Sequence, residues 1–206
     1  MNIMIKSLAA FVLLWVASPV WAQNVEPDGP KVVVEKAVNG ILHALEARTD
    51  SKILTEADRE AIRKQVEGRF DYREMARRSV GRDWKKQPAE QQTVFTKTFS
   101  QLLERSYGNR LSKYHGQTVE FDNAEFKHNK ARVKTRVVDK NKVTPVFYRL
   151  HQNAGTWQVY DIKIEGVSLV GTFREDFKGL LKKDGFDGLL KALQDKVARL
   201  KQKDAS

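Results

Sequence analysis

Apolar residues recur every three to four positions through the first third of the chain, a spacing typical of amphipathic helices. The clearest helical segment is residues 31–48. A second helix is predicted after Thr55, because this N-cap residue type is followed three positions later by Asp58, as in a capping box. A third helix is predicted over residues 71–80, with Asp71 as its cap and Trp84 packed behind it.

The longest predicted helix begins at Pro88, where a proline loses no helical hydrogen bond. Gly116 is expected to end it. Its apolar and aromatic residues keep a period of 3.6 and form a wide stripe: Val94, Phe95, Phe99, Leu102, Leu103, Tyr107, Leu111 and Tyr114.

Alternation of apolar and polar residues then replaces the helical period. Four strands are predicted, at residues 117–126, 131–137, 143–151 and 156–164, and they are joined by short polar turns. Such strands form an antiparallel meander. Pro145 lacks an N–H for the ladder, so its strand is expected to lie at an edge or to begin late.

Helical periodicity returns after Gly166, with Ser168 as the expected N-cap and a break at residues 184–185 between two helices. Helical segments before and after the strands in the sequence predict an α+β fold, in which helices pack on a curved four-stranded antiparallel sheet. A curved sheet wrapped by helices either has a filled centre or leaves it hollow, and periodicity fits both.

The first 22 residues have the features of a secretory signal peptide: Lys6, a short apolar run, and a small-residue exit that ends at Ala22. We therefore expect cleavage after Ala22, a flexible leader over residues 23–30, a single domain over residues 31–200, and a charged tail over residues 201–206. The chain has no Cys, which excludes disulfides, thiol catalysis and Cys-bound zinc.

Basic residues exceed acidic ones, at 37 to 26, which gives a net charge of +11. An exported chain rarely meets nucleic acid, so an acidic protein or an anionic membrane surface is the favoured partner, beside a solvated surface with no partner. The basic residues concentrate around Trp84: Arg73, Arg77, Arg78, Arg82, Lys85 and Lys86.

Motifs for nucleotide binding, nucleophilic catalysis and metal binding are absent from the sequence, and no two His residues have metal-ligand spacing. One enzyme hypothesis remains. Asp161 with Tyr148 or Tyr160 could act as the acid–base pair of a small-molecule isomerase. The alternative is that Asp161 binds a basic strand neighbour or a helix N-terminus.

Several ordered blocks of sequence resemble the MlaC family, also called the toluene-tolerance auxiliary family. The resemblance extends over about residues 31–193. Its blocks are residues 70–72 (Phe-Asp-Tyr), 75–77 (Met-Ala-Arg), 80–81 with Trp84, the stripe from Gln92 to Leu111, residues 148–150 (Tyr-Arg-Leu), 157–162 (Trp-Gln-Val-Tyr-Asp-Ile), 165–170 (Glu-Gly-Val-Ser-Leu-Val), and Phe173-Arg174 with Phe177. Gly171-Thr172 and Phe147 depart from the family pattern.

The resemblance implies a periplasmic phospholipid carrier without catalysis, metal or cofactor, whose cargo is the lipid. It also implies two partners, an outer-membrane lipoprotein–porin complex and an inner-membrane ABC transporter with an MCE-domain subunit, and a role in outer-membrane lipid asymmetry. A chaperone for apolar protein segments remains an alternative. The large apolar residues expected to line the lipid cavity are Phe95, Phe99, Leu103, Val119, Phe121, Val133, Val137, Val146, Tyr148, Val170, Phe173 and Phe177.

Overall fold

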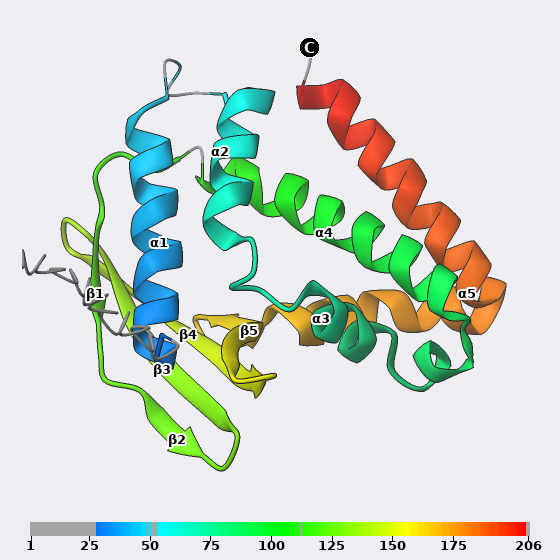
Figure 1. Ribbon diagram of the computed structural model, residues 1–206. Coiled ribbons are helices and arrows are strands. Elements are labelled where there is room, and N and C mark those ends of the chain that lie inside the picture. The colour runs from blue at the N-terminus through cyan, green and yellow to red at the C-terminus, as the bar shows by residue number, and fades with distance from the viewer. Residues whose placement is uncertain (1–27, 49, 51–52, 112, 205–206) are drawn as a thin grey trace, which may run out of the picture.

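The computed structural model describes residues 28–48, 50, 53–111 and 113–204, and among these the side chains of residues 109 and 110 are left aside. The predicted signal peptide and most of the predicted leader lie outside this range. The helices are α1 (Pro30–Glu46), α2 (Glu56–Val66), α3 (Tyr72–Val80), the 3₁₀ helix η1 (Gly81–Lys86), α4 (Ala89–Leu111) and α5 (Leu169–Asp204) (Figure 1).

The expected helix caps form as the sequence indicates. The Thr55 hydroxyl accepts from the Asp58 backbone N–H, and the Asp58 carboxylate accepts from the Thr55 N–H at 2.8 Å, which completes the capping box at α2. The Asp71 carboxylate accepts from the Glu74 N–H at 2.8 Å and caps α3. These local signals fix where the helices begin.

The strands are β1 (Thr118–Phe121), β2 (Glu125–Lys127), β3 (Lys130–Asp139), β4 (Lys142–Asn153), β5 (Thr156–Ile164) and β6 (Val167–Ser168). They form an antiparallel sheet of order β1-β3-β4-β5-β6, with β2 also paired to β3. The α+β fold is confirmed, but the count of four strands is wrong. The segment 117–126, predicted as one strand, divides into β1 and β2. Asp122 lies between them, and its carboxylate accepts a hydrogen bond from Arg136 at 2.8 Å.

Pro145 lies in β4, which is flanked by β3 and β5, so the prediction of an edge strand or a late start is wrong. Pro145 pairs with Arg136 on one side. On the other side β5 has already ended, and the Glu165 N–H donates to the Pro145 carbonyl at 3.1 Å. The missing N–H of Pro145 therefore faces a position beyond β5, where no ladder partner needs it.

Helix α5 contains the predicted break, as a kink rather than a loop. Gly185 has φ 67° and ψ −167°, a conformation that glycine adopts without a Cβ clash. Figure 1 shows the result: the first arm of α5 leaves the sheet, and the second arm returns along α4. We call these the proximal arm (residues 169–184) and the distal arm (residues 186–204).

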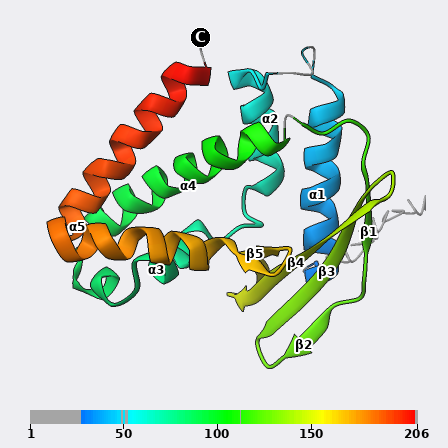
Figure 2. The same cartoon turned by 180° about the vertical axis from the view of Figure 1, so that it is seen from behind.

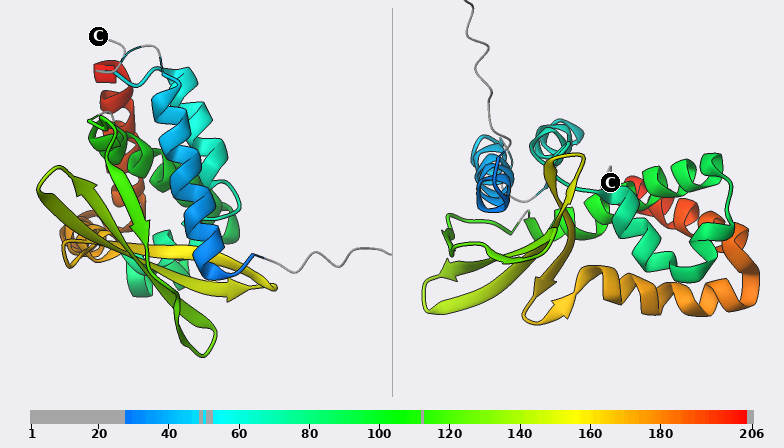
Figure 3. Two further views of the ribbon diagram at one scale, coloured as in Figure 1. Left: turned by 90° about the vertical axis from the view of Figure 1, so that its left-hand side faces the viewer. Right: turned by 60° about the horizontal axis from the view of Figure 1, so that its bottom comes forward.

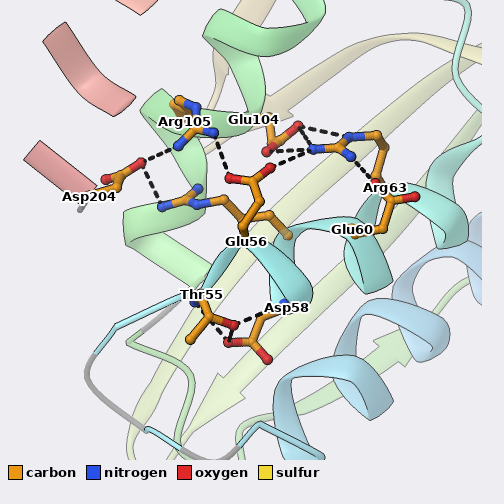
Figure 4. A network of polar contacts seen from close by, with 9 residues as sticks. Thr55, Glu56, Asp58, Glu60, Arg63, Glu104, Arg105 and Asp204 are labelled. Atoms are coloured by element: carbon orange, nitrogen blue, oxygen red, sulfur yellow. Dashed lines mark hydrogen bonds and ion pairs between the residues drawn. The ribbon is translucent and has the colours of Figure 1, made fainter. Parts of the chain in front are cut away.

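The distal arm is fastened at its end by a buried ion-pair cluster, the Asp204 clasp (Figure 4). The Asp204 carboxylate binds Arg59 of α2 at 3.0 Å and Arg105 of α4 at 2.7 Å, and Arg105 also binds Glu56 at 2.8 Å. The Arg59 side chain is only 2% exposed. A Cβ on Gly108 would lie 2.6 Å from its Nη1, so a larger residue there would displace the guanidinium from this position beside α4.

Residues 201–204, predicted as part of a charged tail, continue α5. Lys201 and Lys203 are exposed to solvent, whereas the Asp204 carboxylate is largely buried in the clasp. Burial of two arginines would be unfavourable without a carboxylate between them.

Buried apolar side chains of the described residues form three clusters. The smallest includes Leu45, Leu54 and Ile62, and the two larger ones belong to the two regions seen in Figure 2, the α3–α5 helices and the sheet with α1. The helical core lies among α3, η1, α4 and α5 and includes Phe95, Phe99, Phe173, Phe177 and Trp84. The sheet core lies where α1 covers one face of the sheet and comprises Val33, Val34, Ala131, Val133, Leu150 and Val159. The right panel of Figure 3 shows α1 above the sheet, with the α3–α5 region beside it.

Candidate functional site

The inner face of the sheet, turned toward α1, is apolar. Strand neighbours point to opposite faces, and the register aligns residues of one face across the strands. The inner face carries Val119 and Phe121 of β1, Ala131, Val133, Thr135 and Val137 of β3, Val146, Tyr148 and Leu150 of β4, and Val159, Ile162 and Ile164 of β5. A β-bulge between Arg149 and Leu150 keeps Val159 on this face.

The outer face is charged and ion-paired. Arg136 binds Glu120 at 2.9 Å and Asp122 at 2.8 Å, and Arg132 binds Glu125. Val143, on the same face, is 53% exposed. An apolar ligand that sought a dry surface would therefore bind the inner face.

The six candidates carried by helices lie in the helical core: Phe95, Phe99, Leu103, Val170, Phe173 and Phe177. The rings of the four phenylalanines contact one another, with centroid separations of 5.2 Å for Phe99 and Phe173 and 5.5 Å for Phe173 and Phe177. Phe95 and Phe99 are 0% exposed. These side chains therefore pack against one another and form an ordinary filled core in the structure.

The six candidates carried by strands share the inner face of the sheet but differ in burial. Val133 and Val146 are buried. In contrast, Val119, Phe121, Val137 and Tyr148 are only half-buried, as are their neighbours Ile162 and Ile164. The structure thus brings half of the sequence-predicted set onto one surface and leaves the other half in a separate core.

Tyr148 combines two properties that rarely coincide. Its side chain keeps some accessible surface, yet burial raises the pKa of its phenol to about 12, against the opposing effect of a hydrogen bond with Thr135. A group on an open surface is well solvated and shows no such shift. Burial therefore leaves the Tyr148 phenol poorly solvated, although neighbouring atoms do not cover its side chain completely.

Asp161 has a structural role. Its carboxylate accepts from the Ser168 hydroxyl at 2.8 Å and from the Val170 N–H at 3.2 Å, and lies 3.5 Å from Arg149. The Ser168 hydroxyl accepts from the Gly171 N–H at 2.9 Å, which confirms Ser168 as the N-cap of α5. Both readings of the alternative prediction for Asp161 are met, since it binds a basic strand neighbour and a helix N-terminus.

The isomerase pair is not assembled by the sheet. Asp161 pairs with Arg149, while Tyr148 pairs with Ile162 one position away, so the two side chains point to opposite faces. Tyr160 instead contacts the guanidinium of Arg78, 4.1 Å from its ring centroid, and the ring of His151.

A concavity that the sequence did not indicate lies between α3 and the β4–β5 hairpin. This polar hollow has a volume of about 290 Å³. It is lined by Asp71, Arg73, Glu74, Arg77, Trp84, His151, Gln152 and Asn153. His151 and Asp71, which face each other at 3.0 Å, are 80 positions apart in the chain, and no local pattern connects them.

Within the described residues we find no group of His, Cys, Asp and Glu side chains suited to a metal ion. The helices described there include none long and apolar enough to cross a membrane.

Comparisons with known proteins were made for both sequence and structure. The family model described as "MlaC protein" matches residues 35–195. The chain is 25% identical over 178 residues to the intermembrane phospholipid transport system binding protein MlaC of Haemophilus influenzae, covering 82% of this chain and 83% of that protein. It is 30% identical over 122 residues to the toluene tolerance protein ttg2D of Pseudomonas putida, covering 57% of each.

Among solved structures, a phospholipid-binding protein from Ralstonia solanacearum, determined in complex with a phospholipid, has the same fold. The TM-score is 0.77 at 24% sequence identity, and the match covers 84% of this chain and 99% of that one.

Proposed function

This chain belongs to the MlaC family, and we propose that it binds a phospholipid and carries it through the periplasm between the outer-membrane and inner-membrane complexes of a lipid transport system. The acyl chains lie against the inner face of the sheet. The lining side chains are the half-buried residues of that face: Val119, Phe121, Val137, Tyr148, Ile162 and Ile164.

The observation that carries this proposal is the state of the inner face. Its apolar side chains lie on the face of the sheet on which α1 packs, and yet several of them are incompletely covered. Uncovered apolar surface inside a fold has no stabilising role of its own, because stability increases with the apolar area removed from water. An acyl chain supplies the missing cover, and the high pKa of Tyr148 is consistent with a space that is already poorly solvated.

The energetics of lipid transfer explain why such a carrier is needed. A chain of 16 carbons leaving a bilayer exposes about 15 methylene groups, each unfavourable by ~0.8 kcal/mol, which amounts to about 12 kcal/mol. A lipid therefore crosses an aqueous space slowly unless a protein covers its chains. This task requires a dry surface of suitable shape and no reacting group, so we propose that the protein has no catalytic step.

The partners in this proposal follow from the family and from charge. The names of the relatives describe a phospholipid transport system and toluene tolerance, which supports a route that ends at an MCE-domain subunit of an ABC transporter and begins at an outer-membrane lipoprotein–porin complex, or the reverse. A net charge of +11 favours acidic docking surfaces, with association rates that fall as salt is added.

The test is to purify the mature protein from periplasm, weigh it by native mass spectrometry, and extract and identify its lipid. Val137→Glu places a carboxylate on the inner face and should lower lipid occupancy more than about tenfold, because an unpaired charge beside acyl chains costs several kcal/mol. Val143→Glu is the matched control, since Val143 lies on the outer face and is already exposed.

Wild-type protein that carries no lipid, and takes none from vesicles, would contradict the proposal, and aggregation assays with an unfolded client would then test the chaperone alternative. A Val137→Glu variant with full lipid load would show that the inner face does not hold the chains. Unfolding curves for both variants confirm that each remains folded.

A further inference from the structure

The polar hollow between α3 and the β4–β5 hairpin is separate from the inner face. His151, on its wall, lies three positions after Tyr148 on β4, and odd and even positions of this strand point to opposite faces. Its apolar floor is closed by Trp84, which is 3% exposed and packs edge-on to Phe95 at 6.0 Å. Trp84 thus separates the hollow from the rings of the helical core.

The carboxylates in the wall already have partners. Glu74 accepts from Arg77 at 2.6 and 2.7 Å and from Arg78 at 2.7 Å. Burial alone would raise the pKa of Glu74, but these two arginines outweigh it and lower the pKa. Asp71 accepts from the Glu74 N–H and faces His151. The partners of Glu74 and Asp71 therefore weaken the repulsion between these carboxylates and an incoming anion.

The two arginines in the wall, Arg73 and Arg77, by contrast have N–H groups that are still available to a ligand. Arg73 donates from one Nη to the Gln92 side chain at 2.5 Å, a neutral partner that fixes the guanidinium without neutralising it. Arg77 uses Nε and one Nη on Glu74. The other N–H groups of both side chains have no partner among the described residues. Arg82 and Lys85, which precede and follow Trp84 in η1, are exposed and have no ion pair within the described part of the chain.

We propose that the polar hollow is a docking site for a carboxylate side chain on an acidic segment of a partner protein. Arginine presents a planar pair of N–H donors that matches a carboxylate, and a held guanidinium loses little entropy on binding. The side-chain amides of Gln152 and Asn153 add neutral donors at the rim. The volume of about 290 Å³ gives room for a carboxylate side chain together with bridging water.

A partner protein suits the hollow better than a lipid phosphate does. The walls are polar, the floor is closed, and the site lies on the other side of β4 from the proposed acyl-chain surface. The proposal rests on the proposed function only in assuming that a lipid carrier must dock to a protein at each end of its route. Docking through a site outside the lipid cavity leaves the cargo free to move during contact.

The experiment titrates the isotopically labelled, lipid-loaded mature protein with a hexaglutamate peptide at low ionic strength and follows the backbone amide signals by NMR. We expect the largest changes at residues 71–77 and 151–153. Arg73→Gln and Arg77→Gln should each weaken peptide binding about tenfold, the effect of losing one charge-assisted hydrogen bond. Asn153→Asp, which adds a negative charge to the rim without altering shape, should weaken it as well.

Arg199→Gln is the matched control, because it removes the same charge from an exposed position on the distal arm. If Arg199→Gln weakens peptide binding as much as Arg73→Gln does, the affinity depends only on the net charge of the protein, and the proposal is overturned. Absence of any amide change at the hollow also overturns it, as does Arg73-dependent binding to anionic phosphatidylglycerol vesicles without peptide binding.

Lipid content is measured in every variant, which separates the two proposals. If wild-type protein holds no lipid but binds the peptide through Arg73, the carrier proposal is contradicted and the docking proposal is supported. If lipid-loaded protein does not bind the peptide, the docking proposal is contradicted and the carrier proposal stands.

Discussion

The helical core and the inner face of the sheet are both apolar, but they differ in how their side chains are covered. In the helical core, Phe95, Phe99, Phe173 and Phe177 contact one another and exclude water completely or nearly so. On the inner face, Val119, Phe121 and Val137 point inward and stay half-buried. Apolar residues that satisfy one another stabilise a fold, whereas apolar residues that lack partners are available to a ligand. This difference supports the proposal that the cargo binds the inner face rather than the most aromatic part of the protein.

The largest effect should come from removing a ring of the helical core. Phe99→Ala in lipid-free protein should lower the free energy of unfolding by about 3–5 kcal/mol, because it leaves a cavity among rings that cannot close over it. Val137→Ala on the inner face should lower it by about 1 kcal/mol or less, since that side chain is only half-buried. Urea unfolding followed by fluorescence measures both. Equal losses at the two positions would remove the distinction between the regions.

The next effect concerns the Asp204 clasp, which holds the helical core and does not contact the inner face. Asp204→Asn should lower the free energy of unfolding by about 3 kcal/mol, because Arg59 and Arg105 remain buried without their shared carboxylate. Limited proteolysis should then cut the distal arm first. Lipid content per folded molecule should stay unchanged, and a proportional loss of lipid would mean that the helical core takes part in binding.

The smallest effect compares two tyrosines, one from each region. Burial raises the pKa of both Tyr148, on the inner face, and Tyr72, packed against the helical core, to about 12. The unfolded chain loses these protons near pH 10, before the folded protein does, so stability should fall as the pH rises from 10 toward 12.

Lipid loading should distinguish the two phenols. Acyl chains that displace water from the inner face should raise the pKa of Tyr148 further and leave that of Tyr72 unchanged. Phenolate absorbance in lipid-free and loaded protein, with Tyr148→Phe and Tyr72→Phe to assign each step, provides the measurement. A shift at Tyr72 alone would place the cargo in the helical core.

Sequence reasoning predicted the features that depend on near neighbours. The caps at Thr55, Asp71 and Ser168 each follow from a side chain and a backbone group a few positions apart. Alternation predicted which strand residues share a face. Periodicity indicates that a residue points inward, but not whether another side chain meets it there. For this reason Phe99 and Val137 were predicted to line one cavity, although one is packed and the other is not.

Features built from distant residues escaped prediction for a different reason. Asp204 was assigned to a charged tail because nothing near it in sequence reveals two buried arginines on other helices. The polar hollow joins α3 to a hairpin 80 positions later, and the cluster of basic residues in α3 suggested a surface rather than a concavity. Pro145 misled in the same way, because the end of β5 that accommodates it depends on strand pairing.

The Asp204 clasp also has a consequence for synthesis of the chain. It joins residues 99 positions apart, Arg105 and Asp204, and a ribosome releases them in that order. Until residue 204 is available, burial of Arg59 and Arg105 between α2 and α4 lacks the shared carboxylate that offsets their desolvation. We therefore expect the ends of α2 and α4 to pack together only after the last turn of α5 has been made.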